Sequence, residues 1–414
     1  MSAAKYTRVV WLMAAVAAVS VANLYYAQPL GATIARSLGV GAGSMGAALM
    51  LCQLGYALGM LLLVPLGDGR ERRALMTVTA LGASAMLLLT ALAPGFRSFA
   101  AVNLALGFAS CLPQMAVPFA VGAVPPAERG KAIGTVMSAL LAGILLSRTA
   151  SGSLAQAIGW RGTFVAAAAL MVGLAATIRF ALPPQRPARP LAWRTILASL
   201  AGIIRREPLL RRHALVGAAG FAAFSAFWST LSFQLARLGH GSRAAGLFGV
   251  LGLTGVAVAP IVGRLTGRVR PAILNAAGLV AVIAAFALFW AGARSLIVLA
   301  VGVVALDAGV QGSHLTNQSV IFGLDPDARN RINAVYMVSY FIGGALGTVL
   351  AGWAWDLAGW SGVCLAGMTF AAAGLLPVIG GPGRQRAASA IATAASGSPA
   401  TTSGDSARNR STVT

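Results

Sequence analysis

Twelve long apolar blocks dominate the sequence and restrict the chain to folds that a lipid bilayer permits. About 20 residues of α-helix, each rising roughly 1.5 Å, cross a hydrocarbon layer roughly 30 Å thick. Inside the bilayer every backbone polar group must be satisfied within its own segment, so each block is expected to be an α-helix. The blocks lie near residues 10–30, 44–66, 74–93, 99–123, 132–157, 161–182, 213–235, 244–263, 271–291, 295–322, 333–354 and 360–379. The sequence therefore predicts an all-α membrane protein with twelve transmembrane helices.

The composition excludes the main alternatives to a membrane protein. Hydrophobic residues make up 58% of the chain and charged residues 10%, against roughly 25% charged residues in soluble domains. Disorder of the bulk of the chain is excluded for the same reason. The three cysteines all lie inside apolar blocks, and the sequence offers no metal-ligand cluster, nucleophile–base pair or phosphate-binding loop. We therefore expect no enzyme, no bound metal and no cofactor.

The basic residues of the chain indicate its orientation in the membrane. The formal net charge is +22, and 24 of the 31 Lys and Arg residues lie in one set of alternating connections, against six in the other. By the positive-inside rule, both termini and the central linker are expected to be cytoplasmic. The positive charge is thus explained by topology, and no nucleic-acid partner is expected.

An internal repeat with an offset of 200 residues divides the chain into two halves. Residues 159–162 read Gly-Trp-Arg-Gly and residues 359–362 read Gly-Trp-Ser-Gly, and Gly143 and Gly152 align with Gly343 and Gly352. An even number of spans separates the copies, so they are parallel repeats of six helices. The predicted organisation is an N-terminal bundle over 1–182, a cytoplasmic linker over 183–212, a C-terminal bundle over 213–382 and a disordered cytoplasmic tail over 383–414. The linker is expected to be either an amphipathic helix on the membrane surface or a solvated basic segment.

A loop at the end of the second block carries the most specific motif. Residues 65–73 combine a helix end, an acid and a basic cluster. They resemble the loop between helices two and three of the major facilitator superfamily, G-x-L-x-D-x-x-G-R-[RK], with Glu71 in place of the second glycine. The resemblance implies a cytoplasmic gate in which Asp68, with Arg72, locks the outward-facing state by contacting the other half. The gate residues are Gly67, Asp68, Arg72 and Arg73; a charge cluster that only sets topology is the alternative.

Three further segments resemble a bacterial branch of drug and metabolite exporters within this superfamily. Residues 143–152 can be aligned with the antiporter pattern G-x-x-x-G-P-x-x-G-G, with Arg148 in place of the proline, and residues 23–30 and 309–314 are also similar. The superfamily resemblance covers residues 5–382. It implies a two-bundle transporter of small molecules in the bacterial inner membrane, with H⁺ as the coupling ion. We expect a monomer.

The tenth apolar block holds the candidate proton-coupling residues. Asp307, Gln311, His314 and Gln318 are spaced 4, 3 and 4 residues apart, which places them on one helix face with Asn317 beside them. An ionised carboxylate at the bilayer centre costs roughly 2.5–3.5 kcal/mol, so Asp307 is expected to be paired, hydrated or protonated part of the time. Asp307 and His314 are therefore predicted to relay protons; a structural hydrogen-bond network is the alternative for both.

Arg148 is the second charged residue within an apolar block. It is expected to pair with Asp307, to bind an anionic group of a substrate, or to extend to the membrane interface. In the superfamily the first, fourth, seventh and tenth helices line the central cavity. The predicted cavity residues are Asn23, Tyr26, Gln114, Arg148, Ser225, Trp228, Gln311, Asn317 and Gln318.

Together these features predict a secondary active transporter that works by alternating access. The hypothesis is proton-coupled efflux of a small apolar or amphipathic molecule. Proton-coupled uptake, facilitated diffusion of a small metabolite and a membrane receptor or scaffold without transport are the alternatives. The direction of transport and the substrate are not specified by these motifs.

Overall fold

The computed structural model describes residues 3–68, 70–186, 193–252, 258, 260–262, 264–265, 268–325 and 328–379. Residues Met1–Val378 form one compact unit, and the description below concerns this unit. Part of the predicted linker, 187–192, and the tail 383–414, for which disorder was predicted, lie outside the described residues.

Within the described residues, nine helices are long and apolar enough to cross a membrane. Two of these, α7 (Arg129–Ala181) and α14 (Arg329–Ile379), have 53 and 51 residues and each contain two consecutive spans. The shorter apolar helix α10 (Ser242–Leu251) covers the first part of the eighth predicted span, 244–263, and most of the remainder of that span lies outside the described residues. The remaining α-helices are α1 (Ala3–Val21), α2 (Gly31–Leu38), α3 (Ala42–Leu62), α4 (Arg72–Leu92), α5 (Phe96–Ala109), α6 (Leu112–Ala123), α8 (Trp193–Arg206), α9 (Pro208–Arg237), α12 (Pro271–Ala291) and α13 (Leu296–Ile321). The predicted all-α membrane fold is confirmed.

The internal repeat is visible in the backbone conformation. Helices α7 and α14 each bend at a glycine with positive φ, 73° at Gly159 and 60° at Gly359. The turns after α2 and α9 contain a second such pair, Gly39 with φ 67° and Gly239 with φ 82°. Positive φ favours glycine because a side chain would clash with the backbone there. Both pairs are 200 residues apart, so equivalent turns in the two halves depend on equivalent glycines.

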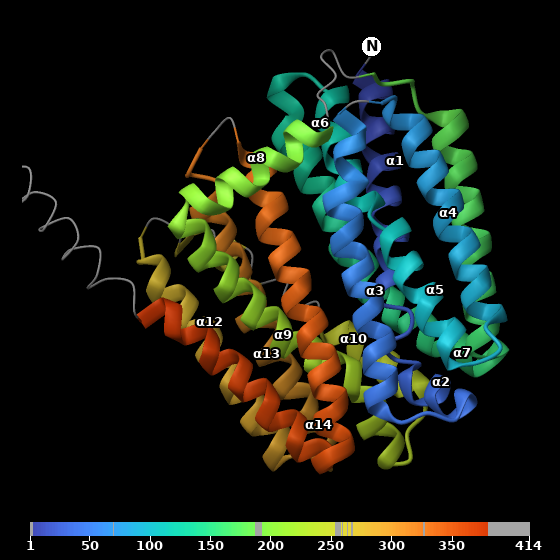
Figure 1. Ribbon diagram of the computed structural model, residues 1–414, viewed down its shortest axis with the longest axis vertical. Helices are drawn as coiled ribbons and strands as arrows, with labels where there is room; N and C mark the ends of the chain where they lie inside the picture. Colours follow the sequence, from blue (N-terminus) through green and yellow to red (C-terminus); the bar gives the residue numbers. More distant parts are fainter. Residues whose placement is uncertain are drawn as a thin grey trace, which may run out of the picture. The chain divides into compact units, whose positions relative to one another are not determined.

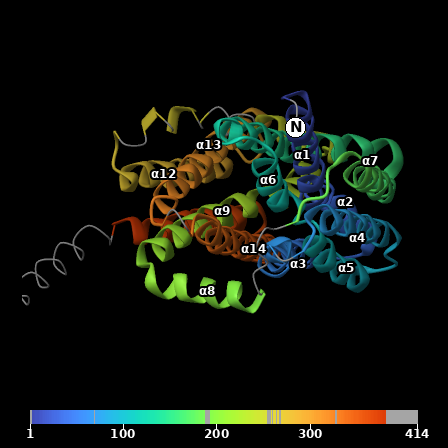
Figure 2. The same cartoon turned by 90° about the horizontal axis from the view of Figure 1, so that it is seen from above.

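The two halves of the unit lie side by side. Figure 2 shows α1 and α3 to α7 on one side and α9, α12, α13 and α14 on the other. Helix α8 lies within the linker and extends beside α9 and α14, so residues 193–206 of the linker are helical, whereas residues 183–186 are not. Helix α9 already begins at Pro208, and the last residues of the predicted linker therefore belong to the first turns of the seventh span.

Glycines allow the halves to approach closely at two equivalent crossings. A Cβ atom placed on Gly246 of α10 would lie 3.2 Å from the Cα atom of Gly152 in α7, and one placed on Gly46 of α3 would lie 3.3 Å from the Cα atom of Gly352 in α14. Gly46 and Gly246, like Gly152 and Gly352, are 200 residues apart. Small residues at such contacts are typical of membrane helices that pack closely.

Backbone N–H groups of the N-terminal half donate to side chains of the C-terminal half at one end of the unit. The N–H group of Gly43, in the first turn of α3, donates to Oδ2 of Asp356 in α14 at 2.8 Å. The N–H group of Ala32 in α2 donates to Oγ of Ser232 in α9 at 3.2 Å. Figure 1 shows α2 and α10 at the end of the unit opposite the N-terminus. The structure is therefore a conformation in which the end that carries α2 is closed; we call it the α2 end.

Candidate functional site

A buried cluster of polar and aromatic side chains lies where α7, α9 and α13 meet. Trp228 of α9 is 2% exposed and Asp307 of α13 is 4% exposed. The indole Nε1–H of Trp228 donates to Oδ1 of Asp307 at 3.4 Å. A predicted proton-coupling residue and a predicted cavity residue are thus brought together, although they are 79 positions apart in the chain.

Arg148 joins this cluster from the N-terminal half. Its guanidinium carbon lies 4.0 Å from the ring centre of Trp228, 4.9 Å from that of Tyr25 and 5.5 Å from that of Phe224. Its Nε–H donates to Oε1 of Gln28 at 2.9 Å. Because the side chain is 1% exposed, it does not extend to the membrane interface.

Arg148 and Asp307 contact the same tryptophan, but they do not form a direct ion pair. Among the described residues, no nitrogen of Arg148 lies within 4.0 Å of an Asp307 oxygen. Arg148 lies against the face of the Trp228 indole, while Asp307 accepts from its N–H group. The two opposite charges still act on each other electrostatically in this buried environment. Trp228 therefore connects the carboxylate of one half with the guanidinium of the other.

A second polar link between the halves passes through Gln53 of α3. Its Nε2 donates to Oγ of Ser225 in α9 at 3.3 Å, and its Oε1 accepts from Oγ1 of Thr348 in α14 at 3.0 Å. All three side chains are buried. Ser225, a predicted cavity residue, is therefore engaged in the contact between the halves in this conformation.

Two other polar residues of α13, His314 and Asn317, have partners on α14 and α9, respectively. Nδ1 of His314 lies 3.0 Å from the Tyr336 hydroxyl of α14, and the His314 ring is 4.7 Å from that of Tyr340. Asn317 faces α9, where its Oδ1 lies 2.7 Å from Nδ1 of His213.

Gln318, Gln311 and Gln114 are half-buried. Nε2 of Gln318 lies 3.5 Å from Oδ1 of Asn333, and Nε2 of Gln114 in α6 donates to the Tyr56 hydroxyl at 3.2 Å. No hydrogen bond joins His314 to Asp307 in the described part of the chain.

The segment between α1 and α2 presents different residues to the site from those the sequence selected. Asn23 and Tyr26 are buried, and both polar atoms of the Asn23 amide lack a hydrogen-bond partner among the described residues. The contacts to Arg148 come instead from Tyr25 and Gln28. Helical spacing did not identify them, because a 3-10 turn and several non-helical turns replace the α-helix after Val21.

A row of aromatic rings extends from the buried cluster along α9 and α14. Phe221 stacks on Tyr340 with 4.1 Å between ring centres and on Phe224 with 5.6 Å, and Phe224 lies 6.0 Å from Trp228. Of the aromatic residues of α9, sequence reasoning selected only Trp228. The missed signal is the spacing of Phe221, Phe224 and Trp228, which follow one another at intervals of three and four residues and so share one helix face.

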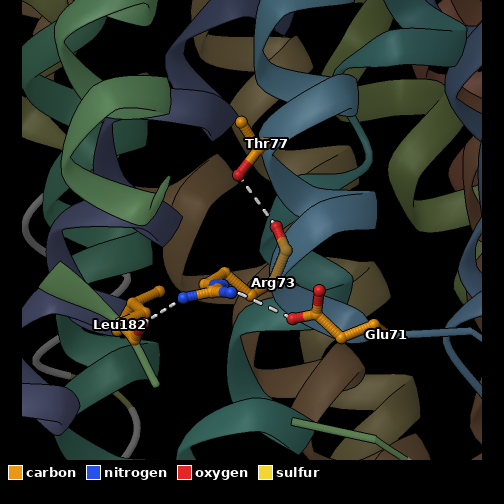
Figure 3. Close-up of polar contacts among 4 residues, drawn as sticks. All are labelled: Glu71, Arg73, Thr77 and Leu182. Atoms are coloured by element: carbon orange, nitrogen blue, oxygen red, sulfur yellow. Dashed lines mark hydrogen bonds and ion pairs between the residues drawn. The ribbon is translucent and has the colours of Figure 1, made fainter. Parts of the chain in front are cut away.

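The loop before α4 and the first turn of α4 contact the chain at the end of the sixth span (Figure 3). Nη1 of Arg73 donates to the Leu182 carbonyl, just after α7, at 3.3 Å, and Nε of Arg73 lies 3.4 Å from Oε1 of Glu71. The Arg73 carbonyl accepts from Oγ1 of Thr77 at 2.9 Å. Glu71 has φ −64°, so this position does not require the glycine of the family pattern. Glu71, which stands in place of the glycine of the family pattern, forms an ion pair with Arg73 instead.

Arg72 connects the same loop to the start of the linker. Its Nε donates to the Gly67 carbonyl at 3.2 Å, and its Nη1 donates to Oε1 of Gln185, also at 3.2 Å. The side chain of Asp68, the acid of the predicted gate, lies outside the described residues. These two contacts of Arg72 are with its own half and with the linker.

These features define an integral membrane protein in which two repeated halves meet around a buried, charged centre. The chain belongs to the Major Facilitator Superfamily, whose family model matches residues 10–347. It is 40% identical over 379 residues to the uncharacterized transporter YgaY of Escherichia coli O157:H7, an alignment that covers 91% of this chain and 96% of that protein. A probable transporter of Streptomyces coelicolor is 33% identical over 356 residues, covering 85% and 83% of the two chains.

Solved transporter structures share the fold at low sequence identity. A bacterial homologue of the human lysosomal transporter Spinster, in an inward-facing and unoccupied conformation, has a TM-score of 0.69 at 16% identity and covers 92% of this chain and 95% of its own. A mutant of the nucleoside transporter NupG has a TM-score of 0.70 at 13% identity, covering 90% and 98%. The family and its named relatives identify a transporter rather than an enzyme.

Proposed function

We propose that this transporter exports a small apolar or amphipathic molecule in exchange for protons, with Asp307 as the residue that carries the proton. The observation that carries the proposal is the contact series Arg148, Trp228 and Asp307, which spans both halves and contains a buried acid. A proton on Asp307 removes the negative charge that accepts from Trp228 and that acts on Arg148. Protonation thus changes a contact between the halves, which proton coupling requires.

The proposed cycle uses the two orientations of the central site. Protonation of Asp307 favours one orientation and substrate binding favours the other, so that the two ligands compete through the conformational equilibrium. His314 lies two turns further along α13 and is half-buried, so we propose it as the second proton-carrying group, between Asp307 and the end opposite α2.

The orientation in the membrane is part of the proposal. The positive-inside rule puts both termini and the linker in the cytoplasm of a bacterial cell, with the protein in the inner membrane. The α2 end is then periplasmic, and the structure is an inward-facing conformation. Fusion of a reporter that fluoresces only in the cytoplasm to the C-terminus tests this orientation, and a dark fusion to a stably inserted protein would contradict it.

Everted membrane vesicles with an imposed pH gradient test the coupling. A panel of neutral, cationic and anionic amphipathic compounds is added, and collapse of the gradient is compared between the wild type and Asp307→Asn. Glu128→Gln is the matched control, because it removes an exposed carboxylate outside the spans. We expect collapse by at least one class of compound in the wild type and the control, and none in Asp307→Asn.

Four outcomes would contradict parts of the proposal. Equal collapse in Asp307→Asn would exclude Asp307 as the coupling acid and make His314→Gln the next variant. Flux of labelled compound without proton movement would indicate facilitated diffusion, and accumulation against the proposed direction would indicate uptake. Absence of flux for every class would favour a receptor or scaffold.

A further inference from the structure

Arg148 has an unsatisfied hydrogen-bond donor in the centre of the protein. The side chain is 1% exposed, its Nε–H is bound to Gln28, and its Nη2 has no partner among the described residues. A buried donor without a partner is destabilising, and more so when the group is charged. An acceptor supplied by a bound molecule would remove this cost.

The surroundings of Arg148 leave only the edge of the guanidinium group for such an acceptor. Trp228, Tyr25 and Phe224 all lie within 5.5 Å of its central carbon, measured to their ring centres. Aromatic faces stabilise a cation that has lost its water, but they do not accept its in-plane N–H groups well. A carboxylate binds in that plane, along the guanidinium edge.

The protein's own carboxylate does not occupy this edge. Asp307 accepts from the indole of Trp228 at 3.4 Å, and its other oxygen, Oδ2, lies next to Gly252. A Cβ atom on Gly252 would lie 2.8 Å from that oxygen, so the glycine keeps room for the carboxylate where it is. The positive charge of Arg148 is therefore stabilised by rings and by the more distant Asp307, while Nη2 has no acceptor among the described residues.

The aromatic row offers a surface for the rest of such a molecule. Phe224, which faces Arg148, stacks on Phe221, and Phe221 stacks on Tyr340, which lies against His314. His314 is half-buried, whereas Arg148 is fully buried, so the row runs from a less buried residue to the cation. Flat apolar molecules pack well against such rings.

We infer that the substrate is an organic anion with a flat apolar body, whose carboxylate or similar group binds the Nη2 edge of Arg148 while the body packs against Phe224 and Phe221. This inference deepens the proposed function and rests on it, because it assigns the substrate class of the same central site. It gives a role to the arginine that replaces the proline of the antiporter pattern. The residue that determines specificity is thus Arg148 in the fifth span, at the position of the proline in the antiporter pattern.

Equilibrium binding to the purified full-length protein in detergent tests the substrate class. The probes are benzoate and indole-3-acetate, with benzamide and benzylamine as neutral and cationic counterparts of benzoate. We expect the wild type to bind the carboxylates roughly tenfold to a hundredfold more tightly than benzamide, because a hydrogen bond to a charged group contributes about 1.5–3 kcal/mol. Arg148→Gln should remove this preference for the anion.

Two milder variants keep the test decisive if Arg148→Gln does not fold. Arg148→Lys keeps the charge but loses the planar edge, and should bind the carboxylates several-fold more weakly. Phe224→Leu keeps the cation but loses a ring, and should weaken acid and amide alike. Equal affinity of the wild type for benzoate and benzamide, or unchanged benzoate affinity in both Arg148→Lys and Phe224→Leu, would overturn the inference.

The failure of this inference and of the proposed function can be told apart. Binding in detergent requires neither a gradient nor flux, so carboxylate binding that depends on Arg148 but moves no protons in vesicles would contradict only the coupling. Proton exchange driven by neutral or cationic compounds, with no binding of the carboxylates, would contradict only the substrate class.

Discussion

Replacement of Gly246 by alanine tests whether the glycine crossings set the closed state of the α2 end. A Cβ atom at this position would lie 2.6 Å from the Arg148 carbonyl oxygen and 3.2 Å from the Cα atom of Gly152. Both are backbone atoms, so α7 and α10 must separate to accept it. Overpacking of this kind costs about 1–3 kcal/mol, and the open state of this end does not bear the cost. The ratio of closed to open molecules should therefore fall roughly 5-fold to 150-fold.

Distances between spin labels across the α2 end measure this shift. Labels on Ser37→Cys and His240→Cys, at exposed positions of the two halves, report separation of the halves in a background without the three buried cysteines. Gly46→Ala, at the equivalent crossing, should act in the same direction. Gly173→Ala is the matched control, because a Cβ atom there meets nothing within 4 Å. An unchanged distance distribution in Gly246→Ala, or an equal change in the control, would refute the reasoning.

Three further substitutions test other contacts. Gly159→Ala places a side chain at φ 73° and should lower stability by about 1–3 kcal/mol, seen as a lower melting temperature in detergent; an unchanged melting temperature would contradict the need for glycine. Asp356→Asn weakens the bond from Gly43 and removes a negative charge near the N-terminus of α3, so the spin-label pair should show a shift of roughly 0.3–1 kcal/mol toward opening, smaller than that of Gly246→Ala. Trp360→Phe leaves the Phe289 carbonyl without its 2.8 Å donor and should cost about 1–3 kcal/mol in the same melting experiment, with no effect on the label distances.

Several features of the central site were predictable because they depend on local chemistry. Asp307 and Arg148 are charged residues inside apolar blocks, where a charge is energetically costly. The sequence alone therefore identifies both as candidate functional residues. Trp228 was predicted to line the cavity. That it contacts both charges depends on how three helices from two halves approach one another, and no sequence spacing reports this.

The segment after α1 shows why residue-level prediction failed elsewhere. Asn23 and Tyr26 were selected from a first block that was expected to be helical over residues 10–30, but the α-helix ends at Val21. Beyond that point the chain forms a 3-10 turn and further turns, so the helical period no longer relates residue number to direction. As a result Tyr25 and Gln28 face Arg148, one and two positions away from the residues that the pattern selected.

The sequence by itself determined the membrane class, the twelve spans and the duplication, because bilayer thickness fixes block length and an offset of 200 residues can be read from letters alone. The tertiary structure decided which end of the molecule is closed and what surrounds Arg148. These properties arise from contacts between helices that are far apart in the chain, such as Gly152 with Gly246 and Arg148 with Trp228. Such contacts depend on helix rotation and approach, which the hydrophobic pattern leaves free because lipid and protein interior are equally apolar.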